Sequence, residues 1–191
     1  MTSTSPADRT HLGRQAWPGT RIRAQVDMRK PWYDGGYSAE SIDDFIALGN
    51  TYEPSSLLFP LEMAIDQKRG RVGLEGLTMA EQTILAVEAL EREVNDGGYG
   101  QFFTNSSGEF APMIVDCLNR IDCPEVANLT QSAIHALGTI ELDAKSLSDA
   151  VERQEVNRAL DECDRRYYSE GEDIGGKLFE FISANRYAVL R

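Results

Sequence analysis

Apolar residues recur three and four positions apart along most of the chain after residue 38, the spacing that places them on one face of an α-helix. The stripe formed by Val156, Leu160, Cys163 and Tyr167 is a clear example. No segment alternates apolar and polar residues as a half-buried strand does. The pattern therefore predicts an all-α fold, in which residues 38–191 form a single compact domain of about seven helices behind an N-terminal arm, residues 1–37.

Capping residues indicate where several of these helices begin. Ser41 with Asp44 and Thr78 with Glu81 have the spacing of N-terminal capping pairs, and Pro124 suits a first helical turn. Together with the apolar stripes, these signals predict helices over 41–48, 55–67, 78–94, 106–121, 124–137, 146–167 and 172–182, with a glycine-containing loop at 69–77.

The arm is rich in Ser, Thr, Pro, Gly and Arg and shows no sustained apolar period, so we expect an extended or disordered segment. It nevertheless holds both tryptophans of the protein, Trp17 and Trp32. Two interpretations remain: a tail partly docked on the core or on a second subunit, and a peptide that binds a partner.

Charge narrows the classes of partner. The 191 residues carry a net charge of -12 with a sequence pI near 4.6, which disfavours direct contact with nucleic acid or an anionic membrane. Up to Glu40 there are six bases and four acids, whereas the remainder holds 13 bases and 27 acids. The acidity therefore belongs to the helical domain, and the expected partner is a basic or DNA-binding protein.

No apolar run approaches a membrane span, and residues 1–10 lack the apolar core of a signal peptide, so we expect a cytoplasmic protein. Cys117, Cys123 and Cys163 are an odd set without zinc-pair spacing, which favours buried, reduced thiols. Nucleotide-binding glycine motifs are also missing, so we expect neither a metal nor a cofactor.

The stretch from Glu91 to Phe110 is the most specialised part of the chain. Gly97 and Gly98 supply the backbone freedom that commonly ends a helix. Around them lie five polar residues and four aromatic residues that we expect to plug the core: Glu93, Asn95, Gln101, Asn105 and Glu109, and Tyr99, Phe102, Phe103 and Phe110.

Two hypotheses fit these polar side chains. In the first they form an internal network that satisfies peptide groups buried beneath neighbouring helices. In the second, paired carboxylates and amides at the Asn95–Glu109 turn form a small-ligand or enzymatic site. The second hypothesis lacks a histidine that could act as a general base or a metal ligand, because His11 lies in the arm and His135 lies on a core-forming helix. No catalytic residue is therefore assigned.

Residues 93–110, Glu93-Val-Asn-x-Gly-Gly-Tyr-x-Gln-Phe-Phe-x-Asn-Ser-Ser-Gly-Glu-Phe110, resemble the signature of a bacterial all-helical family of mostly unknown function, named for a member that acts as a DNA mimic. With the flanking helices the resemblance spans roughly residues 38–181. The resemblance implies a non-enzymatic, acidic interaction module that forms a homodimer. Its carboxylates would occupy the site where a transcription factor or other basic protein binds DNA.

Such a mimic needs carboxylates on one surface, and helix positions three or four apart place side chains about 5–6 Å from each other. Two rows in the sequence have a suitable helical spacing. They are Glu81, Glu88 and Glu91, and Asp149, Glu152 and Glu155. Arginines share the expected helix of the second row and would neutralise part of its charge.

Overall fold

The all-α prediction is confirmed by a computed structural model, which describes residues 30–38, 41–170 and 172–190. These described residues form eight α-helices, against about seven expected, with four short 3-10 helices and no strand. The helices are α1 (Ile42–Ala47), α2 (Leu58–Val72), α3 (Met79–Thr104), α4 (Ile114–Arg120), α5 (Pro124–Ala136), α6 (Ala144–Val151), α7 (Gln154–Glu170) and α8 (Ile174–Ala184), and the 3-10 helices are η1 (Leu48–Asn50), η2 (Pro54–Leu57), η3 (Ser106–Phe110) and η4 (Arg186–Ala188).

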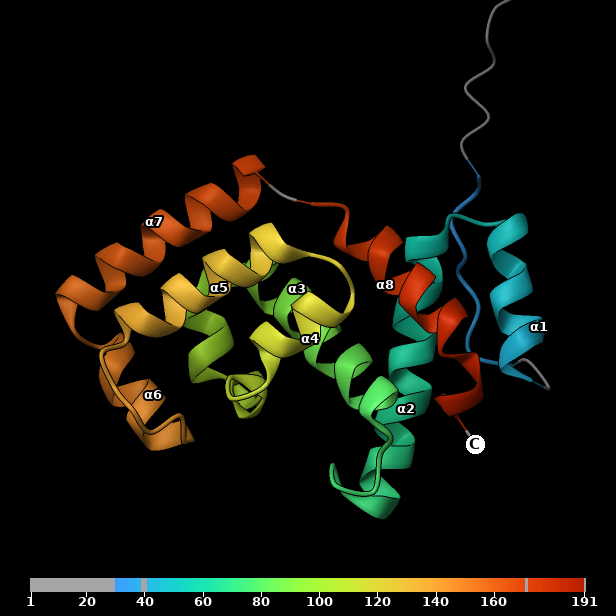
Figure 1. The fold of residues 1–191 in the computed structure, drawn as a ribbon, viewed down its shortest axis with the longest axis horizontal. Helices are drawn as coiled ribbons and strands as arrows, with labels where there is room; N and C mark the ends of the chain where they lie inside the picture. Colours follow the sequence, from blue (N-terminus) through green and yellow to red (C-terminus); the bar gives the residue numbers. More distant parts are fainter. Residues whose placement is uncertain (1–29, 39–40, 171, 191) are drawn as a thin grey trace, which may run out of the picture.

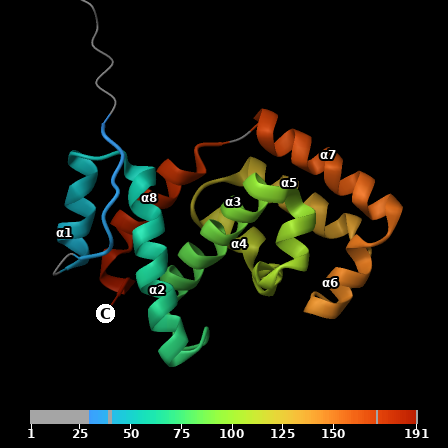
Figure 2. The ribbon, with the colours of Figure 1, turned by 180° about the vertical axis from the view of Figure 1, so that it is seen from behind.

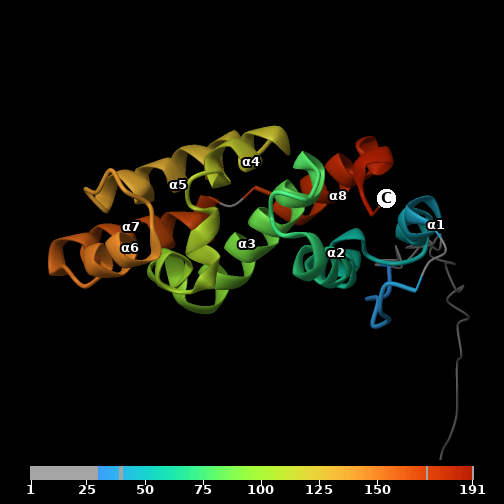
Figure 3. The ribbon, with the colours of Figure 1, turned by 90° about the horizontal axis from the view of Figure 1, so that it is seen from below.

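Helix α3 runs through the middle of the molecule and joins its two ends. Helices α1, α2 and α8 gather at one end and α5, α6 and α7 at the other, with α4 beside the middle of α3, as Figures 1 and 2 show from opposite sides. Seen from below in Figure 3, the molecule is elongated and α3 lies between these groups. Apolar residues of α3 such as Ile84, Leu90 and Phe102 are fully buried, so this helix supplies core to both ends.

Two predicted capping pairs are confirmed. The Ser41 hydroxyl accepts from the Asp44 amide, and Thr78 with Glu81 forms a reciprocal capping box at the start of α3. The expected loop at 69–77 is shorter than predicted, because α2 continues through Gly70 to Val72 and is capped by Gly73, whose φ is +76°. A single glycine costs a helix only about 1 kcal/mol, so Gly70 does not stop it.

The helix expected over 146–167 is divided into α6 and α7. Asp143 caps α6 by accepting from the amides of Lys145 and Ser146. At the corner between the two helices, the Arg153 guanidinium donates to the carbonyls of Leu137 and Ala150. These bonds satisfy main-chain acceptors freed where α5 and α6 end, which stabilises the break.

Residues 30–38 lie along the end of the molecule formed by α1 and α2. The Glu53 amide donates to the Pro31 carbonyl at 2.9 Å, and the Tyr33 amide donates to the Ser56 hydroxyl at 2.9 Å. Trp32 is 69% exposed. The remainder of the predicted arm, including Trp17 and His11, lies outside the described residues.

All three cysteines are buried free thiols, as predicted. Burial raises the pKa of each, to about 12 for Cys123. Within the described part of the chain no group of three or more His, Cys, Asp or Glu side chains is placed to hold a metal ion.

Candidate functional site: the glycine turn and the acidic surfaces

The glycine pair bends α3 instead of ending it. Gly97 (φ -156°, ψ 17°) and Gly98 (φ +79°) leave helical geometry, and the helix resumes at Tyr99. The freed amide of Tyr99 donates to the Asp164 carboxylate of α7 at 2.8 Å. Asp164 therefore acts as an N-cap supplied by a distant helix.

Only glycine fits at the second position of this bend. A Cβ on Gly98 would lie 2.7 Å from the Asp164 Cγ, and its positive φ is unfavourable for other residues. Burial raises the pKa of Asp164, while the Tyr99 amide lowers it.

Glu93 is the centre of a polar network just inside the bend. Its Oε2 accepts from Gln101 Nε2 at 2.9 Å and from Asn105 Nδ2 at 2.8 Å, and its Oε1 accepts from Ser107 Oγ at 2.9 Å. Burial raises the pKa of Glu93, but these three hydrogen bonds outweigh it and hold the pKa below the ordinary value. The carboxylate is thus kept ionised as an acceptor, which does not suit a general acid.

Two predicted members of this set lie elsewhere. The Asn95 amide group is exposed and donates to the Glu91 carbonyl one turn back, at 2.7 Å. Glu109 is paired with Arg69 of α2 at 2.7 Å. The prediction that all five polar side chains converge is therefore wrong for Asn95 and Glu109, because each finds a nearer partner on its own helix or on α2.

The four aromatic residues of the turn are buried in the core. They are Tyr99, Phe102, Phe103 and Phe110. The Tyr99 hydroxyl also bonds the buried Thr130 hydroxyl of α5 at 2.8 Å. The bend is therefore tied to α5 through Thr130 and to α7 through Asp164.

A hollow of about 360 Å³ lies beside the turn, between α2, α3 and η3. Ser107, Glu109 and Phe110 line it from the turn, whereas Glu93 and the amide side chains of Asn95, Gln101 and Asn105 do not. Two ion pairs are among its lining residues, Arg69 with Glu109 and Arg92 with Glu62. These pairs neutralise most of the charge that a ligand would meet there.

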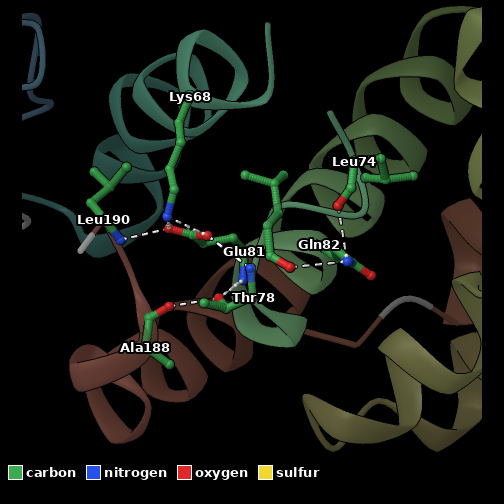
Figure 4. Close-up of polar contacts among 8 residues, drawn as sticks. Lys68, Leu74, Thr78, Glu81, Gln82, Ala188 and Leu190 are labelled. Atoms are coloured by element: carbon green, nitrogen blue, oxygen red, sulfur yellow. Dashed lines mark hydrogen bonds and ion pairs between the residues drawn. The ribbon is translucent and has the colours of Figure 1, made fainter. Parts of the chain in front are cut away.

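Glu81 does not lie on the surface as part of an acidic row, in contrast to the sequence prediction. Its side chain is fully buried and accepts from Lys68 Nζ, from the Thr78 amide at 3.0 Å and from the Leu190 amide at 2.7 Å (Figure 4). Thr78 in turn donates its hydroxyl to the Ala188 carbonyl at 2.6 Å. Glu81 thus joins α2, the start of α3 and the C-terminal segment.

The other two residues of this row are partly buried. Glu91 accepts from the Tyr167 hydroxyl of α7, and burial raises its pKa. Glu88 lines a second hollow of about 290 Å³ with Glu62 and Glu91. Burial, followed by the charges of these two carboxylates, raises the pKa of Glu88 to about 8. The first row therefore does not form an outward acidic surface.

The second row is exposed. Asp149, Glu152 and Glu155 lie on α6, at the corner and on α7, at the end of the molecule away from α1 and α2 (Figure 1). Asp149 is paired with Lys145. The side chains of Glu152 and Glu155 form no hydrogen bond or ion pair with any residue that the structure describes.

Several important contacts could not be found from the sequence. Asp164 and Tyr99 are 65 positions apart, and Leu190 is 109 positions from Glu81. Asp164 stands in an ordinary charged helix, and Leu190 contributes a main-chain amide, so neither residue type gives a signal. For Gly98, the sequence indicated the unusual backbone but not its distant cap.

Comparison with known proteins gives one match. The family model described as DMP19-like protein matches residues 75–185, from the loop before α3 to the end of α8. Neither a curated protein nor a solved structure matches the chain. The match contains the whole glycine turn and both acidic rows.

Proposed function

We propose that this chain, which belongs to the DMP19-like protein family, is a non-enzymatic acidic module that occupies the DNA-binding surface of a transcription factor or other basic protein. The observation that supports this role is the exposed acidic corner between α6 and α7, where Glu152 and Glu155 have no described partner. We further propose that it acts as a homodimer in the cytoplasm, without a cofactor and without direct contact to nucleic acid.

The charge balance favours this role. Residues 30–191 hold 14 bases and 29 acids, a net charge of -15. The described part of the chain also offers exposed carboxylates that accept no hydrogen bond and form no ion pair there: Asp34, Glu75, Asp116, Glu125, Glu141, Glu152, Glu155, Asp161 and Glu180. DNA-binding proteins hold the duplex mainly through Lys and Arg contacts to phosphates, and unpaired carboxylates can meet the same cations.

The outward face of α7 limits where a partner would bind. Arg158 and Arg165 are exposed beside Asp161 and Glu162, and Arg165 pairs with Glu162 at 2.7 Å. Mixed charges of this kind attract a basic surface weakly. We therefore assign the strongest attraction to the corner where α6 meets the first turn of α7, and not to the rest of that helix.

The alternative, a ligand or enzymatic site at the Asn95–Glu109 turn, is less well supported. Glu93 is saturated by three side-chain donors, and the hollow beside the turn is lined by none of the amides that would form the site. We propose instead that this network braces the bend of α3.

Capture from the native cell extract at low and high salt, with identification by mass spectrometry, would find the partner. A captured DNA-binding protein is then tested with its own DNA in the presence of this chain. We expect DNA to be displaced, and we expect added salt to weaken the protein complex steeply. Simultaneous binding of DNA and this chain, or binding insensitive to salt, would refute the proposal.

A matched pair of double variants tests the corner itself. Glu152→Gln with Glu155→Gln should slow association with the partner and reduce its salt dependence, because rim charges act mainly on the association rate. Glu75→Gln with Glu180→Gln removes the same charge from exposed sites on other elements and is the control. Equal effects of the two pairs would show that total charge, and not the corner, is responsible.

A further inference from the structure

Helix α2 carries an apolar face that no described residue covers. Phe59 is 60% exposed and Met63, one turn later, is 45% exposed. Phe59 borders the hollow beside the turn, the hollow lined by Glu88, and a third of about 370 Å³ that Gly36 and Tyr37 also line. We call this surface, centred on Phe59 and Met63, the α2 face.

The α2 face has an acidic margin. Glu62, Glu88 and Glu91 line the hollow next to Phe59, with Arg92 as the one base among its lining residues. Arg92 is already paired with Glu62 at 2.6 Å. The Glu88 side chain forms no hydrogen bond or ion pair within the described ranges, and a cation that reached this margin would favour its ionised form.

The chain itself contains a segment of complementary chemistry. Residues 1–29 hold five arginines and two acids, opposite in sign to the rest of the protein. Within them, residues 14–23 read Arg-Gln-Ala-Trp-Pro-Gly-Thr-Arg-Ile-Arg, with three arginines and the large apolar side chain of Trp17. An aromatic flanked by cations suits an apolar face with an acidic margin.

The segment can reach this surface. The described chain starts beside η2, where Pro31 accepts from the Glu53 amide. Phe59 follows Glu53 by six positions, roughly 10 Å along a helix. The 13 residues from Trp17 to Lys30 can span up to roughly 43 Å when extended. This reach is several times the distance along the chain axis from Glu53 to Phe59.

We propose that residues 14–23 dock on the α2 face of the same chain, with Trp17 against Phe59 and Met63 and an arginine at the Glu88 margin. Docking would cover the apolar side chains and place a cation beside Glu88, where it favours the ionised form of that carboxyl group. It does not depend on the proposed role as a DNA mimic, since it concerns the end of the molecule opposite the α6–α7 corner.

The test uses the full chain with Trp32→Phe, which leaves Trp17 as the sole tryptophan. We expect blue-shifted Trp17 emission that acrylamide quenches less than in the urea-unfolded chain. Phe59→Ser should lower the ratio of docked to undocked arm about fivefold, the change expected when one aromatic contact is lost. Arg21→Glu with Arg23→Glu should also increase quenching, and circular dichroism checks that each variant remains folded.

Ile140→Ser is the matched control, because Ile140 is an equally apolar and fully exposed side chain in the loop between α5 and α6. It should leave Trp17 emission unchanged. Trp17 quenched as readily as in the unfolded chain, or an Ile140→Ser effect equal to that of Phe59→Ser, would overturn the proposal. Shielding that grows with protein concentration would also overturn it, because the occupant would then be a second copy.

Discussion

Replacement of Glu81 by Gln should destabilise the protein strongly, although sequence reasoning placed this residue on an outward acidic row. The buried carboxylate accepts from Lys68 Nζ at 2.9 Å and from two main-chain amides, those of Thr78 and Leu190. An amide side chain has one acceptor oxygen, so it cannot serve all three donors, and its own NH2 group would face donors. Breaking a buried ion pair costs about 3–5 kcal/mol.

Urea and thermal unfolding followed by circular dichroism would measure this loss. For a chain of this size, a cost of about 3 kcal/mol corresponds to a fall in Tm of roughly 6–12 °C. The control is Glu75→Gln, an exposed carboxylate without a described partner, which should shift the free energy of unfolding by no more than about 0.5 kcal/mol. If Glu81→Gln is as mild as this control, the contacts of Glu81 with Lys68, Thr78 and Leu190 do not stabilise the fold and the reasoning is refuted.

Two further substitutions test the bend and the buried charge. Gly98→Ala should lower the free energy of unfolding by at least about 2 kcal/mol, because it forces a positive φ on alanine and meets Asp164, whereas Gly70→Ala in the exposed last turn of α2 should be neutral or stabilising in the same urea titration. Glu88 is protonated in the folded protein up to about pH 8 but ionises near 4.5 when unfolded, so it lowers stability as pH rises between these values. Glu88→Gln should therefore match the parent near pH 4.5 and exceed it above pH 8, by at most about 5 kcal/mol and by less where an arginine of residues 14–23 lies beside Glu88; a stability difference independent of pH would contradict this.

Local chemistry was readable from the sequence, and long-range pairing was not. The Thr78–Glu81 box was predicted because capping depends on residues three positions apart. The same glutamate was also assigned to the surface, because nothing near it in sequence shows that Lys68 and Leu190 enclose it. Gly97 and Gly98 were expected to end a helix for a similar reason: the carboxylate of Asp164 that lets the helix restart comes from α7.

The contacts of Glu81 also indicate how much of the chain is needed for independent folding. The family match covers residues 75–185, yet two of the donors to Glu81, Lys68 and Leu190, lie beyond its ends. A fragment trimmed to the matched residues would keep the Glu81 carboxylate but lose two of its hydrogen-bond donors, the Lys68 ammonium and the Leu190 amide. The family match and the expected folding unit therefore have different bounds: the matched sequence starts at residue 75, whereas we expect stable folding to require Lys68 of α2 and the chain as far as Leu190.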